Sequence, residues 1–122
     1  MIPVLLIEHL AGIGGGQTYL IDLVSKLDRS RFCPVVTLVA QGELYDRVAA
    51  AGAITEIVDI RSLRRRHPGA SLGGILRLVR IIRRHGVRVI HVNSQKALMF
   101  ALPAGLLTRT PVVWHCHVDR DF

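Results

Sequence analysis

Short apolar runs alternate with segments of helical periodicity along the whole chain. Five runs rich in Val, Ile and Leu predict strands over residues 3–10, 34–40, 54–60, 87–92 and 111–117. The apolar spacing between them predicts helices over residues 20–27, 43–51, 71–85 and 94–107. This alternation is typical of right-handed β-α-β units around a parallel sheet. We therefore expect an α/β, Rossmann-like doubly wound fold with about five strands.

Single residues mark several element boundaries. Gly52 and Gly86 follow predicted helices and suit glycine C-caps. Ser71 suits the N-cap of the third helix, after a polar loop expected over residues 61–70. Pro103 predicts a disturbed turn in the last helix, because proline removes a helical donor.

The composition is that of one folded domain. The chain has 122 residues, enough for one hydrophobic core and not for two, and 50% of them are hydrophobic. Cys33 and Cys116 lie far apart in predicted strands without a C-x-x-C spacing. We expect both to be small buried hydrophobic residues rather than a disulfide or metal ligands.

Charge is distributed unevenly. The net charge is +7, and no acidic residue lies between Asp59 and Asp119. Such a basic balance suggests an anionic partner, namely phospholipid, nucleic acid or a phosphorylated ligand. Scarce aromatic residues and the absence of a recognition motif disfavour nucleic acid.

Two interpretations of the arginine-rich segment stay open. A membrane-facing surface would be formed by the following residues: Arg64, Arg65, Arg66, Arg80 and Arg84. The alternative is a solvated face of a sheet-covering helix. The sequence shows no secretory signal and no apolar run of the roughly 18 residues needed to span a bilayer. We expect a cytoplasmic protein, either soluble or peripheral at an anionic membrane.

A glycine-rich segment follows the first predicted strand. Residues 12–16 are expected to form a turn at the carboxyl edge of the sheet, and Gly14, Gly15, Gly16 and Gln17 are candidate ligand-binding residues. A tight turn without a ligand is the alternative. A dinucleotide fingerprint is disfavoured because Gln17 stands where its third glycine is needed. The sequence contains neither a phosphate-binding G-x-x-x-x-G-K nor a G-x-S-x-G nucleophile motif.

Polar residues also follow the fourth and fifth predicted strands. Asn93 and Ser94 are candidate ligand contacts, with helix capping as the alternative. His115 and His117 alternate with Cys116, so both imidazoles face one side of the strand. We expect them to contact a ligand, and we expect no metal because no third ligand is evident nearby.

Three segments follow one another along the chain: residues 14–17 (GGGQ), 88–94 (RVIHVNS) and 111–117 (PVVWHCH). In order and spacing they resemble the start of family 4 glycosyltransferases of the GT-B fold. The resemblance implies two Rossmann-like domains facing a cleft, with the N-terminal domain mainly binding the acceptor. It further implies retaining transfer from a nucleotide sugar to a hydroxyl of a glycan or lipid-linked acceptor, without a metal or other cofactor.

The resemblance also assigns roles to single residues. Gly15 and Gly16 would let the donor pyrophosphate approach, and His117 would contact the donor sugar and support catalysis. The chain lacks the C-terminal nucleotide-sugar domain of the family, so residues 1–122 are expected to be a truncated N-terminal domain without activity of its own. Two alternatives stay open: a standalone flavodoxin-like module for a small anionic ligand, and a peripheral membrane domain.

Overall fold

Five parallel strands form one sheet in the computed structural model, which describes residues 2–8, 15–58, 68–92 and 94–114. The strands are β1 (Ile2–Ile7), β2 (Phe32–Leu38), β3 (Ile54–Ile57), β4 (Val89–Val92) and β5 (Val112–Trp114). They are ordered β3-β2-β1-β4-β5, and every neighbouring pair is parallel. The predicted Rossmann-like fold is confirmed. A flavodoxin-like module is wrong, because that fold orders its strands 2-1-3-4-5.

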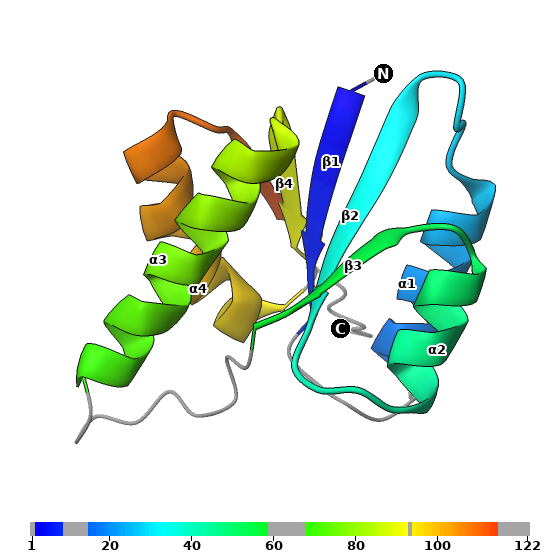
Figure 1. The fold of residues 1–122 in the computed structure, drawn as a ribbon, viewed down its shortest axis with the longest axis horizontal. Helices are drawn as coiled ribbons and strands as arrows, with labels where there is room; N and C mark the ends of the chain where they lie inside the picture. The colour runs from blue at the N-terminus through cyan, green and yellow to red at the C-terminus, as the bar shows by residue number, and fades with distance from the viewer. Residues whose placement is uncertain (1, 9–14, 59–67, 93, 115–122) are drawn as a thin grey trace, which may run out of the picture.

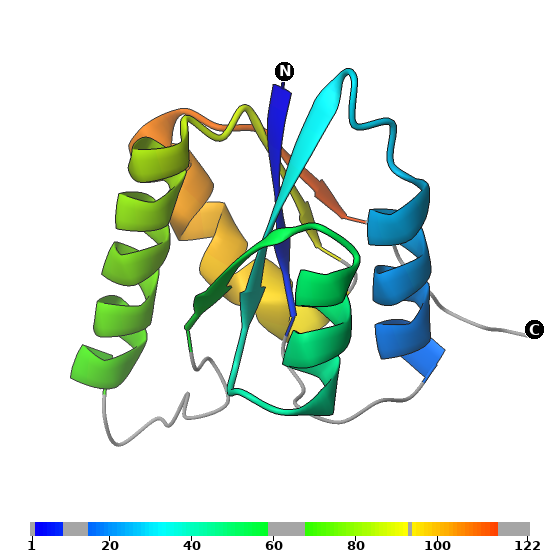
Figure 2. The same ribbon diagram turned by 45° about the vertical axis from the view of Figure 1, so that its right-hand side comes forward.

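Helices cover both faces of the sheet (Figure 1; Figure 2). They are α1 (Gly15–Lys26), α2 (Glu43–Ala50), α3 (Pro68–His85) and α4 (Gln95–Thr108). Strand side chains alternate between the faces, so Leu6 and Val36 pack with α1 and α2, whereas Leu5 and Ile90 pack with α3 and α4. Within the described ranges, no helix combines the length and the apolar character that crossing a membrane requires.

Both predicted glycine C-caps are confirmed. Gly52 follows α2 with a φ of 96°, and Gly86 follows α3 with a φ of 64°. Residues with a side chain rarely adopt this left-handed region of the backbone, so glycine ends each helix at low conformational cost.

Two helices begin earlier than the apolar spacing predicted. The third begins at Pro68, so Ser71 lies inside it and is not its N-cap. Proline suits a first helical turn because its missing N–H would have no helical partner there. The first begins at Gly15, so Gly15 and Gly16 belong to the first turn of α1 rather than to the preceding turn.

α4 runs from Gln95 to Thr108 and includes Pro103, so the helix does not end at this residue, and the disturbed turn expected there stays a prediction. One further expectation needs correction. Cys33 is a free thiol and is half-buried rather than buried, while Cys116 lies outside the described residues.

Candidate functional site

The strand order places a topological switch point, where the connections leave in opposite directions, at the carboxyl edge of the sheet. β1 and β4 are central neighbours, and Ile7 pairs with Val92 at their carboxyl ends. From β1 the chain continues to α1 and β2 on one side, whereas from β4 it continues to α4 and β5 on the other. Connections that diverge in this way leave a crevice between them, which is where open α/β sheets bind ligands.

The helices that follow β1 and β4 both begin at this edge. Ser94 is the N-cap of α4, and its Oγ accepts a hydrogen bond from the backbone N–H of Ala97 at 3.1 Å. Neither α1 nor α4 carries an acidic residue in its first turn. The first-turn N–H groups and the positive ends of both helix dipoles are therefore not balanced by a carboxylate of the same turn, which favours an anion.

The structure brings part of the predicted site together. Gly15, Gly16 and Gln17 form the first turn of α1, and Ser94 begins α4 at the same sheet edge. The capping geometry supports the structural alternative for Ser94, and its ligand contact stays a prediction. Four predicted site residues lie outside the described residues: Gly14, Asn93, His115 and His117.

The structure describes some of the predicted membrane-facing arginines and not others. Arg64, Arg65 and Arg66 lie outside the described residues. Arg80 and Arg84 are both exposed on α3. The Arg84 guanidinium lies 3.5 Å from the Glu56 carboxylate of β3, so its side chain is directed towards the edge of the sheet.

Glu8 is a buried acidic residue at the carboxyl edge of the sheet that sequence reasoning missed. It directly follows β1, is 2% exposed, and its backbone N–H donates to the Thr37 carbonyl at 3.0 Å. Its side chain is not without a partner. The sequence did contain a sign of this position, because the acidic residue directly follows an apolar run that suits a strand buried on both faces. A buried carboxylate is costly and needs a specific environment.

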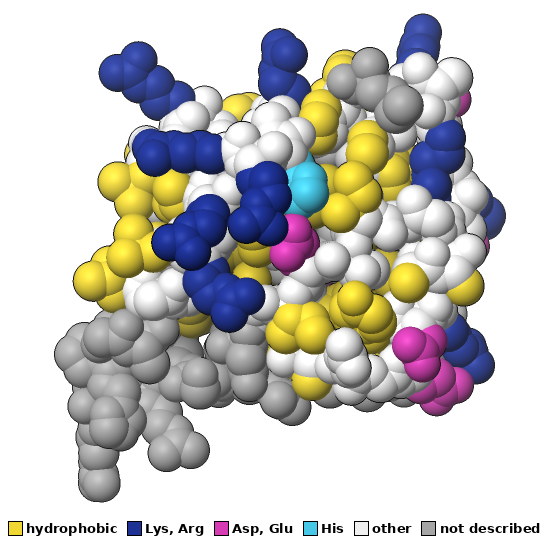
Figure 3. Space-filling view, in the orientation of Figure 1, with side chains coloured by type: hydrophobic (Ala, Val, Ile, Leu, Met, Phe, Trp, Pro, Cys, Tyr) yellow, Lys and Arg dark blue, Asp and Glu magenta, His cyan; other side chains and the backbone are white. Residues whose placement is uncertain are grey.

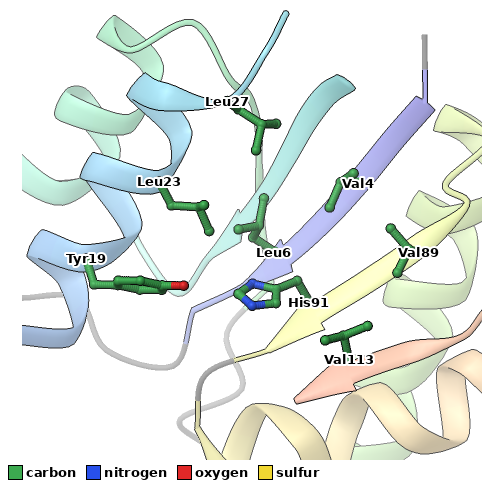
Figure 4. Close-up of a pocket in the computed structure, with 8 residues that line it drawn as sticks. All are labelled: Val4, Leu6, Tyr19, Leu23, Leu27, Val89, His91 and Val113. Carbon is green, nitrogen blue, oxygen red and sulfur yellow. The ribbon is translucent and has the colours of Figure 1, made fainter. Parts of the chain in front are cut away.

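A mostly apolar pocket of about 250 Å³ lies beside the crevice, between α1 and the strands β1, β4 and β5 (Figure 4). Its lining residues are Val4, Leu6, Tyr19, Leu23, Leu27, Val89, His91 and Val113. Tyr19 and His91 point towards one another from opposite walls and supply its polar groups. His91 lies within β4 and faces α1.

No three His, Cys, Asp or Glu side chains within the described ranges lie close enough together to hold a metal ion. A resolved pKa shift lies in the loop before β2, away from the carboxyl edge of the sheet. There the Ser30 hydroxyl and backbone N–H both donate to the Asp28 carboxylate, and these bonds lower the pKa of Asp28.

Residues 13–121 match the family described as Glycosyltransferase Family 4. Comparison with the curated protein sequences gives no significant match.

Three solved structures share the fold over nearly the whole chain. Anabaena Alr3699/HepE, solved in complex with UDP and glucose, is 24% identical over 96% of this chain and 30% of its own, with a TM-score of 0.74. A glycosyltransferase from Rickettsia africae is 16% identical, covering 99% and 31%, with a TM-score of 0.81. Acinetobacter baumannii MurG is 15% identical, covering 100% and 37%, with a TM-score of 0.76.

These identities are low, so the likenesses establish the fold, which is that of a portion of a GT-B structure. The chain spans about a third of the length of the solved structures it matches.

Proposed function

The chain belongs to Glycosyltransferase Family 4, and from this premise we propose that it is the N-terminal part of an enzyme that transfers a sugar from a nucleotide-sugar donor to a hydroxyl acceptor. In this proposal a second Rossmann-like domain binds most of the donor, and residues 1–122 form the acceptor side of the cleft. The observation that carries the proposal is that α1 and α4 both begin at the carboxyl edge of the sheet and that neither has an acidic residue in its first turn.

The beginning of α1 is the proposed contact for the donor pyrophosphate. Gly15 and Gly16 have no side chains to keep the phosphate oxygens away from the backbone. During transfer the bond between the anomeric carbon and the pyrophosphate oxygen breaks, and negative charge grows on the leaving nucleoside diphosphate. Fixed N–H dipoles aimed at that charge stabilise the transition state more than the ground state. The similar Anabaena protein, which was solved with UDP and glucose, supports a nucleotide-sugar donor.

Retention of configuration is part of the proposal. The acceptor oxygen forms its bond on the face of the anomeric carbon from which the diphosphate leaves, and the acceptor proton leaves with the diphosphate. His117, which follows the fifth strand, is the proposed catalytic contact to the donor sugar, with His115 beside it. A neutral imidazole there can donate to a sugar hydroxyl or to developing charge.

The test uses the full-length enzyme that contains this chain. Wild-type protein is supplied with a panel of nucleotide sugars, and the anomeric configuration of the product is read by NMR. We expect retention, and we expect His117→Ala to lower kcat by roughly 10²-fold with a smaller change in donor KM, as for a lost oxyanion-type donor.

Cys116→Ala is the matched control, since Cys116 alternates with the two histidines and is expected to face the other side of the strand. It should leave kcat nearly unchanged. An inverted product would remove the retaining mechanism. Full activity of both His115→Ala and His117→Ala would remove the strand-end histidines from catalysis, and no transfer from any donor would contradict the proposed function.

A further inference from the structure

The packing of α1 on the sheet is incomplete beside β4 and β5. Leu20 and Val24, the fully buried apolar residues of α1, pack in a core cluster with residues of β1, β2 and α2. Among the described residues, none from β4 or β5 belongs to that cluster. The pocket of about 250 Å³ occupies the space between α1 and these strands instead. Close apolar packing therefore fixes α1 towards β2, and other contacts must set its position towards β4.

Tyr19 and His91 close this space near the carboxyl edge of the sheet. There a small cavity of about 10 Å³ lies between them and the side chains of Leu6, Ile7, Leu20 and Leu23. Tyr19 and His91 are both half-buried, and they point towards one another from α1 and β4 (Figure 4). A tyrosine hydroxyl and a neutral imidazole can each donate and accept a hydrogen bond. In apolar surroundings such a pair is well suited to fix the distance between its two elements.

The pair stands directly behind the starts of two helices. Tyr19 lies about one helical turn after Gly15, the first residue of α1. His91 lies in β4 beside Leu6 of β1, and the chain continues from it to Ser94, the N-cap of α4. A contact between Tyr19 and His91 therefore links the first turn of α1 to the strand that leads into α4.

The arginines of α3 lie on the other side of the sheet. Figure 3 shows basic side chains gathered over α3, which packs on the face opposite to α1. An anion at the start of α1 would thus be bound by backbone N–H groups rather than by these guanidiniums. The effect of a helix dipole falls off within the first turn. The exact position of α1 consequently decides how well its N–H groups can stabilise charge.

We propose that Tyr19 and His91 are positioning residues for glycosyl transfer: their contact holds the first turn of α1 where its N–H groups meet the leaving nucleoside diphosphate. This inference rests on the proposed function. In it neither side chain contacts the donor, and both act through the backbone of α1. The polar groups of His91, and not only its volume, should therefore matter for turnover.

Kinetics of the full-length enzyme that contains this chain test the role of His91, with the nucleotide sugar that the wild-type enzyme accepts. His91→Leu places an apolar side chain of similar size in a mostly apolar pocket, so we expect an unchanged or higher melting temperature. It should nevertheless lower kcat about tenfold with a smaller change in donor KM, because a misplaced α1 loses transition-state stabilisation. His91→Gln keeps a donor and an acceptor, and should retain kcat within about threefold.

Tyr19→Phe tests the other half of the pair, because it removes the hydroxyl alone. It should lower kcat about as much as His91→Leu, and the double variant should show no further loss, since both changes break the same contact. Val89→Ala is the matched control. Val89 lies on the same strand and lines the same pocket, so its truncation should lower the melting temperature but change kcat less than about threefold.

Hydrogen exchange of the full-length enzyme reports the position of α1 without any donor. His91→Leu should speed exchange in the first two turns of α1 about tenfold, and Val89→Ala should not. An active wild-type enzyme with normal kcat in His91→Leu, or with equal kcat losses in His91→Leu and Val89→Ala, would overturn the positioning role and leave the proposed function standing. A wild-type enzyme that transfers no sugar would contradict the proposed function, and this inference with it.

Discussion

Gly105 shows how strongly one residue can constrain the packing of α4 on the sheet. A Cβ at this position would lie 2.7 Å from the Thr110 carbonyl oxygen and 2.9 Å from Cγ2 of Val112. Because the first of these atoms belongs to the backbone, α4 and β5 would have to separate. We expect Gly105→Ala to lower the free energy of unfolding by about 1–3 kcal/mol, as overpacking does.

Gly73 is the matched control for that substitution. It also lies inside a helix, but a Cβ there would meet nothing within 4 Å. Gly73→Ala should therefore raise the free energy of unfolding by about 0.5–1 kcal/mol, because alanine loses less backbone entropy on folding. Urea denaturation of both variants measures the contrast. Changes of the same sign would show that steric fit does not distinguish the two sites.

At the residue scale, the sequence predicts a role only when the cause is local. Gly52 and Gly86 end helices through their own φ angles, so their neighbours in the chain were enough to identify them. Gly105 depends on its contact with Thr110 and Val112, which chain folding alone brings together. Glu8 is similar, since only the sheet shows that its buried position lies at the carboxyl edge.

At the element scale, Arg29 links the ends of two helices. Its Nη2 donates to the carbonyls of Val24 and Ala51 at 2.7 and 2.6 Å, and its Nη1 donates to that of Gly52 at 3.1 Å. These carbonyls lie at the C-terminal parts of α1 and α2, where a cation also stabilises the helix dipoles. Loss of Arg29 would leave them without this donor.

We expect Arg29→Ala to lower the free energy of unfolding by about 1–3 kcal/mol, in the range of charge-assisted hydrogen bonds. Arg31→Ala is the matched control, because Arg31 is exposed and its side chain forms no hydrogen bond within the described ranges. It should change stability by less than about 0.5 kcal/mol. Thermal and urea unfolding of the two variants measures the difference. If both had the same effect, general charge rather than helix linkage would explain the role of Arg29.

Element existence was predictable where apolar spacing is regular, but element starts were not. Periodicity reports the residues that face the core, so it does not detect a first turn made of Gly15, Gly16 or Pro68. The exposed apolar side chains of α4, among them Met99, Leu102 and Leu106, were missed for a related reason. When both sides of a helix are apolar, the pattern gives no direction, and only the packed structure shows which side is left exposed.

At the scale of the whole molecule, the alternation of strands and helices was enough to predict which edge of the sheet carries the carboxyl ends of the strands and the starts of the following helices. Right-handed crossovers place the starts of α1 and α4 at that edge whatever their detailed sequence. The sequence did not reveal the pocket between Tyr19 and His91, because it forms between a helix and a strand that are about 70 residues apart. Packing between residues so far apart in the sequence produces no periodic pattern of apolar positions.

The whole molecule also leads to an expectation about activity. The chain spans 30%, 31% and 37% of the three solved proteins whose fold it shares. On the proposed function, it supplies one wall of the cleft and the start of α1, whereas most of the donor contacts belong to the second domain. In many enzymes, preorganised polar groups around the reacting atoms contribute most of the rate enhancement. A chain that supplies only one wall of the cleft should therefore not sustain turnover. We expect the folded 122-residue chain to release no detectable nucleoside diphosphate from a panel of nucleotide sugars.

The full-length enzyme, assayed at equal concentration, is the control, and circular dichroism verifies that the short chain is folded. Turnover by the short chain at a rate near that of the full-length enzyme would place the complete active site within these 122 residues and contradict the two-domain assignment.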